Sequence, residues 1–183
     1  MPELLRPVWA AIACLLLLSA PLLRADSGPV IDEKVQRAIA TFRLETEEGA
    51  RLMDKAAAVL VFPDVVQMGF GIGGEYGEGS LLIDGESVGY YSTGGSSFGL
   101  QVGLQFKALM LLFMTDTALM KFRRHRKGWE AGEDGQIALA TIGAGGSIDA
   151  DAVSKPIVGF VFSNKGLMYN LSLEGNKITP LKR

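Results

Sequence analysis

The sequence predicts an α+β domain. We expect a strongly curved, mostly antiparallel, glycine-rich sheet that can curl toward a barrel, covered by two N-terminal helices and one short middle helix. Three observations predict this fold. Two blocks, 59–105 and 134–149, place glycines between short apolar runs. Two segments, 31–42 and 46–57, carry apolar residues at helical spacing. A charged stretch, 117–124, follows a continuous apolar run and is expected to be the middle helix.

The glycine-rich blocks are expected to be strands. Each glycine inside a helix costs about 1 kcal/mol relative to alanine, whereas in a strand it permits bulges, tight turns and close backbone approach. Pro63-Asp64 is expected to close the first strand, and Asp84-Gly85 and Gly94-Gly95 are typical of turns. The expected strands are 58–62, 69–76, 79–83, 87–91, 97–105, 108–114, 136–142, 157–163, 166–173 and 177–180.

The two N-terminal helices each have one apolar face. The apolar residues of the first are Ile31, Val35, Ala38, Ile39 and Phe42. Ser27 or Asp32 can cap this helix, and Thr46 can cap the next one. In the simpler interpretation both apolar faces cover the sheet. In the alternative, the first helix lies on a membrane surface, a role for which it is short and only modestly basic.

Residues 1–25 have the pattern of a secretory signal peptide, and 26–183 are expected to form a single domain. The apolar run 8–18 is shorter than the roughly 20 residues of a transmembrane helix. A polar sequence begins at Asp26, which favours cleavage after Ala25. The protein is therefore expected to be exported, periplasmic or extracellular, and peripherally associated with a membrane.

Two alternatives to cleavage after Ala25 stay open. An uncleaved anchor would have to include Pro21 and Arg24, which argue against it, and a lipidated Cys14 would lie inside the apolar run. Cys14 is the one cysteine of the 183-residue chain. Its removal would leave no disulfide and no thiolate metal site, which suits a bacterial periplasm or exterior.

Composition and motifs argue against nucleic-acid binding, catalysis and a cofactor. The formal net charge is −2, whereas nucleic-acid-binding domains are usually clearly basic. With a single histidine the chain cannot assemble a catalytic triad or a histidine-rich zinc site. Glu75 with Glu78 is more simply a pair of exposed turn carboxylates than an acid–base pair, and Asp149 with Asp151 offers too few ligands for a hard cation. We assign no catalytic residue, no metal ligand and no cofactor.

One dense basic group stands out in this acidic chain. It comprises Arg123, Arg124, His125, Arg126 and Lys127, and Trp129 follows. Basic residues near an anionic bilayer contribute about 1 kcal/mol each, and tryptophan favours the water–lipid interface. We therefore predict lipid binding by Arg123, Arg124, Arg126, Lys127 and Trp129. A solvated loop with a core tryptophan stays open, as does a second basic group formed by Lys34, Arg37 and Arg43.

Several short motifs, in order from about residue 31 to the C-terminus, resemble the lipid-binding SYLF domain. They are Phe62-Pro63, 69–71 (GFG), 73–79 (GGEYGEG), Tyr90-Tyr91, 99–101 (GLQ), 114–116 (MTD), 128–130 (GWE), 143–149 (GAGGSID) and 164–168 (NKGLM). The resemblance implies a single compact domain that binds anionic lipids. For eukaryotic relatives it also implies actin-filament binding and membrane–actin coupling. The SH3 and FYVE modules of some relatives are absent from this sequence.

These observations together predict a non-enzymatic lipid-binding module of the bacterial cell envelope that recognises anionic phospholipid headgroups. The alternatives are an envelope structural or protein-interaction module without lipid specificity, and an enzyme of unrecognised chemistry. Actin is not expected to be a partner of an exported bacterial protein.

Overall fold

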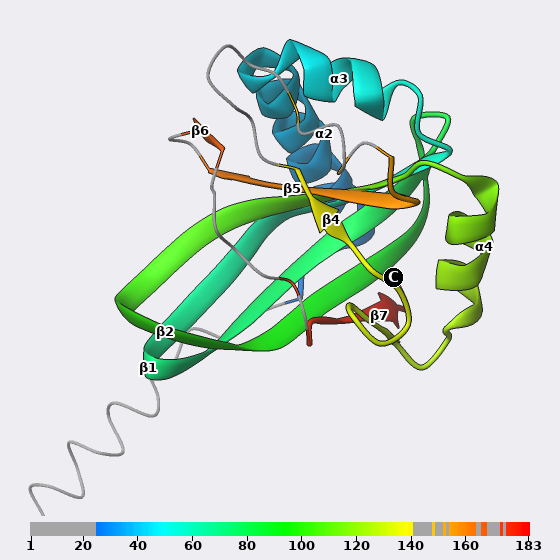
Figure 1. Cartoon of the computed structure of the whole chain (residues 1–183). Helices are drawn as coiled ribbons and strands as arrows, with labels where there is room; N and C mark the ends of the chain where they lie inside the picture. Colours follow the sequence, from blue (N-terminus) through cyan, green and yellow to red (C-terminus); the bar gives the residue numbers. More distant parts are fainter. Residues whose placement is uncertain are drawn as a thin grey trace, which may run out of the picture.

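The α+β class predicted from the sequence is confirmed by a computed structural model of the chain (Figure 1). The structure describes residues 25–140, 148, 152, 154–163, 166–167, 173 and 175–183. Its elements are α2 (Gly28–Glu45), α3 (Glu47–Met53), β1 (Ala58–Ile83), β2 (Glu86–Phe113), α4 (Asp116–Arg124), β3 (Trp129–Glu130), β4 (Ala138–Leu139), β5 (Ile157–Ser163), β6 (Gly166–Leu167) and β7 (Lys177–Leu181). Two N-terminal helices and one short middle helix are present, as predicted.

The described strands form one seven-stranded sheet that is mostly antiparallel. β2 lies at its centre. One edge of β2 pairs with β1 over the length of the hairpin, while the other edge pairs with β7 near its start and with β5 near its end. β3 extends the sheet beyond β7, and β4 and β6 pair with β5. The β4–β5 pair is the parallel one.

β1 and β2 are far longer than the sequence predicted, at 26 and 28 residues. The prediction of separate short strands was wrong because the expected breaks do not break the ladder. Pro63-Asp64 falls in a register shift between Phe62 and Val65, where a proline can leave the ladder without ending the strand. Gly94 and Gly95 pair in register with Tyr76 and Glu75, so no turn forms there.

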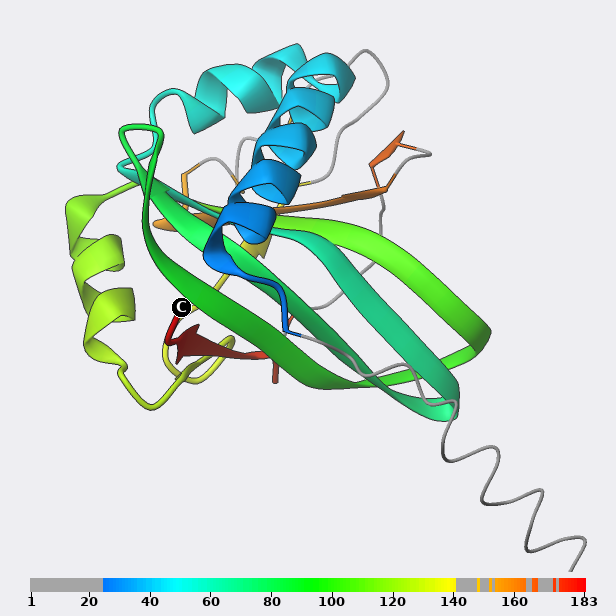
Figure 2. The same cartoon turned by 180° about the vertical axis from the view of Figure 1, so that it is seen from behind.

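The long β1–β2 hairpin curves back strongly, which gives the sheet the shape of a half-barrel (Figures 1 and 2). Two parts of β1 meet across the curve. A Cβ on Gly77 would lie 2.9 Å from Cγ2 of Val65, and one on Gly79 would overlap the carbonyl oxygen of Val61. Glycine is needed at these positions because the backbone of one segment occupies the space of a side chain on the other.

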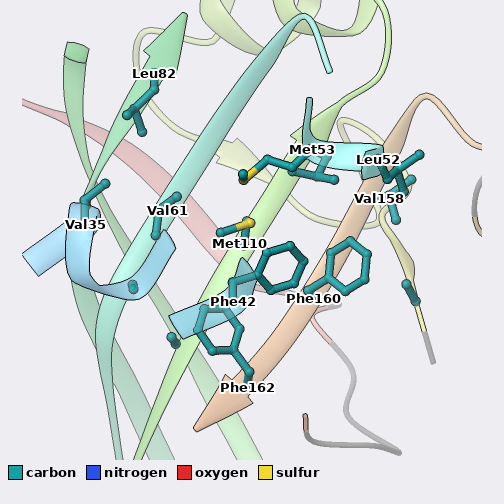
Figure 3. Close-up of a cluster of buried hydrophobic side chains, with 14 of the residues drawn as sticks. Val35, Phe42, Leu52, Met53, Val61, Leu82, Met110, Val158, Phe160 and Phe162 are labelled. Atoms are coloured by element: carbon teal, nitrogen blue, oxygen red, sulfur yellow. The ribbon is translucent and has the colours of Figure 1, made fainter. Parts of the chain in front are cut away.

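The helices α2 and α3 cover one face of the sheet (Figures 2 and 3). The Phe42 ring of α2 lies 4.9 Å from Phe160 and 5.5 Å from Phe162 of β5. Other side chains buried in this cluster are Ile31, Val35, Ala38, Leu52, Met53, Val61, Leu82, Met110, Leu112 and Val158. The predicted apolar face of the first helix therefore packs on the sheet.

A second apolar cluster covers the opposite face, where α4 packs. Leu109, Leu111 and Phe113 of β2 point into it, while Met110 and Leu112 point toward α2 and α3. Because both faces are covered, this end of β2 is apolar at every position rather than at every second one. The prediction of a central strand at 108–114 is thereby confirmed, and its last described strand residue is Phe113.

Several predicted helix caps and turns can be compared with the structure. Thr46 caps α3 as predicted, its Oγ1 accepting from the Gly49 amide at 3.0 Å, but α3 ends at Met53 and not near 57. The predicted turn at Asp84-Gly85 is confirmed, with φ of 51° and 82°. Asp32 does not cap α2; it accepts hydrogen bonds from Ser87 and Tyr90 of β2. Among the described residues, no helix combines the length and apolar character needed to cross a membrane.

Candidate functional site

Four of the five predicted lipid-binding residues lie at the end of α4 and in the turn that follows it, and Trp129 begins β3. Thr115 caps the start of this helix, its Oγ1 accepting from the Ala118 amide at 3.2 Å. Leu119 and Phe122 bury the inner face of the helix. The last turn carries Lys121 and the first two arginines of the predicted site, next to the negative end of the helix dipole, which favours cations.

Arg123, Arg124, Arg126 and Lys127, named here the basic cluster, are all exposed to solvent. None of these four side chains forms an ion pair with a carboxylate in the described part of the chain. His125 lies between them and behaves differently. Its Nδ1 is 3.4 Å from Oδ1 of Asp134. All four predicted cations are therefore exposed, and none is in an ion pair among the residues that the structure describes.

The second basic group has its charges compensated. Lys34 pairs with Asp26 at 2.8 Å and with Asp64 at 3.1 Å. Arg37 pairs with Glu33 and Arg43 with Asp54, each at 2.6 Å. The hydrogen bond to Asp26 raises the pKa of Lys34, and the hydrogen bond from Arg43 lowers the pKa of the Asp54 carboxyl. A local positive field is therefore much weaker at this group than at the basic cluster.

Trp129 does not share the surface of the basic cluster, which corrects the prediction for this residue. Its side chain is buried, with the residue 2% exposed. The indole packs at 5.7 Å, edge to face, on Phe122 of α4, and a Cβ on Gly135 would lie 2.8 Å from its Cζ2. Trp129 is thus a core residue that holds α4 and the following loop against the sheet. It is not placed to insert into a bilayer.

Lys177 is a neighbour of this site that sequence reasoning missed. It is exposed and lies on β7, directly opposite Glu130 of β3. A Cβ on Gly128 would come within 2.5 Å of its Cε, so the lysine stem runs over the loop that carries the basic cluster. No spacing in the sequence links it to the cluster, because the contact depends on β3 pairing with β7.

The pair Glu75 and Glu78 is not a pair of exposed turn carboxylates, and that interpretation is corrected. Glu75 is buried and accepts hydrogen bonds from Lys107, at 2.6 Å, and from Asn176. The Glu78 side chain, 11% exposed, accepts from Tyr76 and Arg183. Both oxygens of Glu75 therefore accept hydrogen bonds, whereas Tyr76 and Arg183 both donate to Oε1 of Glu78.

Other predicted features can be placed only in part. Asp149 and Asp151, the glycines at 143–147 and the leader residues 1–24 lie outside the described residues. Within the described ranges, no group of three or more His, Cys, Asp or Glu side chains could hold a metal ion.

Two large apolar side chains are exposed close together on the hairpin: Met68 is 64% exposed and Phe106 is 59% exposed. Phe106 lies opposite Val66, two residues from Met68 along β1.

Comparison with known families agrees with the resemblance seen in the motifs. A family model described as "Ysc84: Las17-binding protein actin regulator" matches residues 94–183. The matched segment contains most of β2, all of α4, the basic cluster, β5 and β7. This family is associated with actin and lipid binding. No curated protein matches the chain. Residues 94–183 therefore match the Ysc84, or SYLF, domain family, in agreement with the resemblance carried by the motifs.

Proposed function

We propose that the protein is a non-enzymatic module that binds anionic phospholipid headgroups at a membrane surface through the basic cluster. One observation carries the proposal. Four exposed cations lie within five consecutive positions and lack carboxylate partners in the described part of a chain whose formal net charge is −2. Because the group has no ion-pair partner among the described residues, an external anion is the partner that its chemistry fits.

The chemistry of the cluster suits a phosphate-bearing surface. Three of its four residues are arginines, whose planar guanidinium donates two parallel hydrogen bonds to phosphate oxygens. Near an anionic bilayer each basic residue contributes about 1 kcal/mol. Because the four side chains are already exposed, binding requires little desolvation of the protein and no opening of its core.

The surrounding structure explains how the cluster is presented. The Phe122 ring lies 4.9 Å from that of Phe113 and 5.7 Å from that of Trp129, so tilted and edge-to-face ring contacts fix the end of α4 to the sheet. Arg123 and Arg124 then end the helix, and Arg126 and Lys127 occupy the turn that follows. Consecutive residues at a helix end and turn point in different directions, so we expect two or three of the four to meet a membrane plane together.

We further propose that this binding takes place in the bacterial cell envelope, after export directed by residues 1–25. The leader pattern described above supports this location. Actin is not proposed as a partner, because an exported bacterial protein would not encounter it.

A protein-interaction function is the second candidate. It is favoured by the exposed apolar pair Met68 and Phe106 and by the family description, which names a Las17-binding protein and actin regulator. In this case the hairpin surface, and not the basic cluster, would be the binding site. The two candidates differ in their dependence on salt, because apolar contact is not screened.

Vesicle co-sedimentation of the protein beginning at Asp26 tests the proposal. We expect binding to phosphatidylcholine vesicles that contain phosphatidylglycerol, and none to phosphatidylcholine alone. The bound fraction should fall between 0.01 M and 0.15 M salt, because the Debye length shortens from about 30 Å to about 8 Å. Equal binding to both vesicles, unchanged by salt, would contradict the proposal.

A further inference from the structure

The first residues after the expected cleavage point are fixed to the fold by three separate contacts. The Asp26 backbone nitrogen donates to Oε2 of Glu78 at 3.2 Å. The Asp26 carboxylate accepts from Lys34 at 2.8 Å. Two residues on, Gly28 is buried against Tyr90, where a Cβ would lie 2.8 Å from the phenol oxygen. The chain is therefore held at the residue where the sequence predicts that the mature protein begins.

Glu78 contacts both Asp26, near the start of the described chain, and Arg183. Its Oε2 faces Asp26, and its Oε1 accepts from Arg183 at 2.6 Å and from the Tyr76 hydroxyl at 2.7 Å. The side chains of Glu78 and Arg183 are only 11% and 18% exposed. Solvent therefore screens charges around Glu78 less than at an open surface.

While residue 25 is attached, the ion pairs that involve Asp26, Asp64 and Glu78 contain more carboxylates than cations. Three carboxylates, Asp26, Asp64 and Glu78, face two cations, Lys34 and Arg183. The neutral amide of Asp26 supplies a hydrogen bond to Glu78 but no charge. A third cation at the position of the Asp26 nitrogen would balance the three carboxylates.

We infer that cleavage after Ala25 supplies this cation: the new α-ammonium group of Asp26 docks on Glu78 and joins the two ends of the domain in one charge cluster. In the cleavage, a leader peptidase adds water across the Ala25–Asp26 peptide bond. Ala25 leaves with the new carboxylate, and Asp26 keeps the new amino group, which is protonated at neutral pH. The inference rests on the export proposed above, and it assigns to Glu78 a role in sensing the mature N-terminus.

The pKa of the docked amino group should be distinct from those of the neighbouring groups. An unperturbed α-amino group has a pKa of about 7.7–8.0, and the Glu78 carboxylate should raise it by about one unit. Two neighbouring groups have pKa values raised above this range. The hydrogen bond to Asp26 raises the pKa of Lys34 above its ordinary 10.5, and burial and Glu78 raise the pKa of Tyr76 to about 12. The window from pH 7 to 9 therefore isolates the amino group.

The sign of the effect on stability follows. Since the amino group has a higher pKa in the folded protein, its contribution is complete below the unfolded value. It is lost as the pH rises through the folded value. The mature protein should therefore lose about 3–5 °C of melting temperature between pH 7 and 10 through this group. The Glu78→Gln variant should lack this loss.

The experiment starts from the full chain expressed with its leader in a bacterial host. Mass spectrometry of the exported protein should find Asp26 as its first residue. Amine labelling as a function of pH, read by mass spectrometry on the N-terminal peptide, then gives the titration midpoint of the α-amino group. We expect a midpoint about one unit higher in the wild type than in Glu78→Gln. A form that retains Ala25 should behave like Glu78→Gln.

Arg183→Gln is the matched control, because it removes the other cation on Glu78 without touching the amino group. It should keep the raised midpoint. A mature N-terminus at any other residue would overturn the inference, as would equal midpoints in wild type and Glu78→Gln. Glu78→Gln leaves the basic cluster intact, so its vesicle binding should equal that of the wild type. If the wild type shows the raised midpoint but does not bind the vesicles, the proposed function alone is contradicted.

Discussion

Glu75 and Lys107 form a buried ion pair across the curve of the β1–β2 hairpin. Nζ of Lys107 donates to Oε2 of Glu75 at 2.6 Å, and both side chains are 5% exposed. In the strand ladder the two residues are far apart, since Glu75 lies opposite Gly95 and Lys107 lies opposite Val65. The pair can form only when the hairpin curves back on itself. Asn176 completes it by donating to the other oxygen of Glu75.

Removal of one member of this pair should be strongly destabilising. Lys107→Met leaves the Glu75 carboxylate buried without its counter-charge, which costs about 3–5 kcal/mol. The double variant Glu75→Gln with Lys107→Met removes both charges and keeps an acceptor for Asn176. It should be more stable than Lys107→Met alone. Urea unfolding of the wild type, Glu75→Gln, Lys107→Met and the double variant measures this coupling. Additive losses would mean that the pair does not hold the curve closed.

The closest approach within β1 gives a second prediction. An alanine Cβ at position 79 would overlap the Val61 carbonyl, and backbone cannot move aside as a side chain can. Gly79→Ala should therefore lower the free energy of unfolding by about 3 kcal/mol or more. Gly74→Ala on the same strand is the control, because its nearest atom would be the Gly95 oxygen at 3.7 Å. Its effect should stay within about 0.5 kcal/mol. Similar effects in both variants would contradict the described curvature.

The contrast between two glycine turns shows how far the sequence predicts this fold. Asp84-Gly85 and Gly94-Gly95 have similar turn composition, but only the first pair adopts positive φ. At Gly95 the absence of a side chain serves a different purpose, because a Cβ there would overlap the side chain of Asn176. That contact joins positions distant in sequence. Glycine content thus predicted a curved sheet, but it could not distinguish a hairpin turn from a position inside a continuous, curved strand.

The candidate site was predictable to the extent that its residues are neighbours in sequence. The four cations of the basic cluster are adjacent, so they were found. The Arg37–Glu33 ion pair follows the i,i+4 spacing, so the sequence contains the signal for it. The Lys34–Asp64 ion pair and the contact of Lys177 with Gly128 depend on tertiary packing. Trp129 was misassigned because a tryptophan beside a basic run is compatible with either an interface or a core. Only the packing of Phe122 and Gly135 decides between them.

Trp129 is the only tryptophan from Asp26 onward, so its fluorescence reports on this packing directly. We expect blue-shifted emission with little quenching by iodide, because the indole is 2% exposed. Vesicles containing brominated lipid should not quench it on binding. Strong quenching would show that the indole leaves the core and enters the bilayer, as the sequence alone suggested.

Alkaline titration tests the environment of Tyr76. Burial of part of the ring and the hydrogen bond to Glu78 raise the pKa of Tyr76 to about 12. Because the folded value is the higher one, stability from this group is complete below about pH 10, the unfolded value, and is lost as the pH rises toward 12. Absorbance of tyrosinate should therefore show a late step that Tyr76→Phe removes. An unchanged titration curve in this variant would contradict the assignment.

The most direct test of lipid binding by the basic cluster compares two serine variants in the vesicle assay. One replaces Arg123, Arg124, Arg126 and Lys127, and the control replaces the ion-paired Lys34, Arg37 and Arg43. Thermal melts establish that both remain folded. At about 1 kcal/mol per residue, loss of three contacts should weaken binding of the first variant to phosphatidylglycerol vesicles roughly a hundredfold, while the control should bind nearly as the wild type does. If the first variant is folded and binds like the wild type, the basic cluster is not the lipid-binding site.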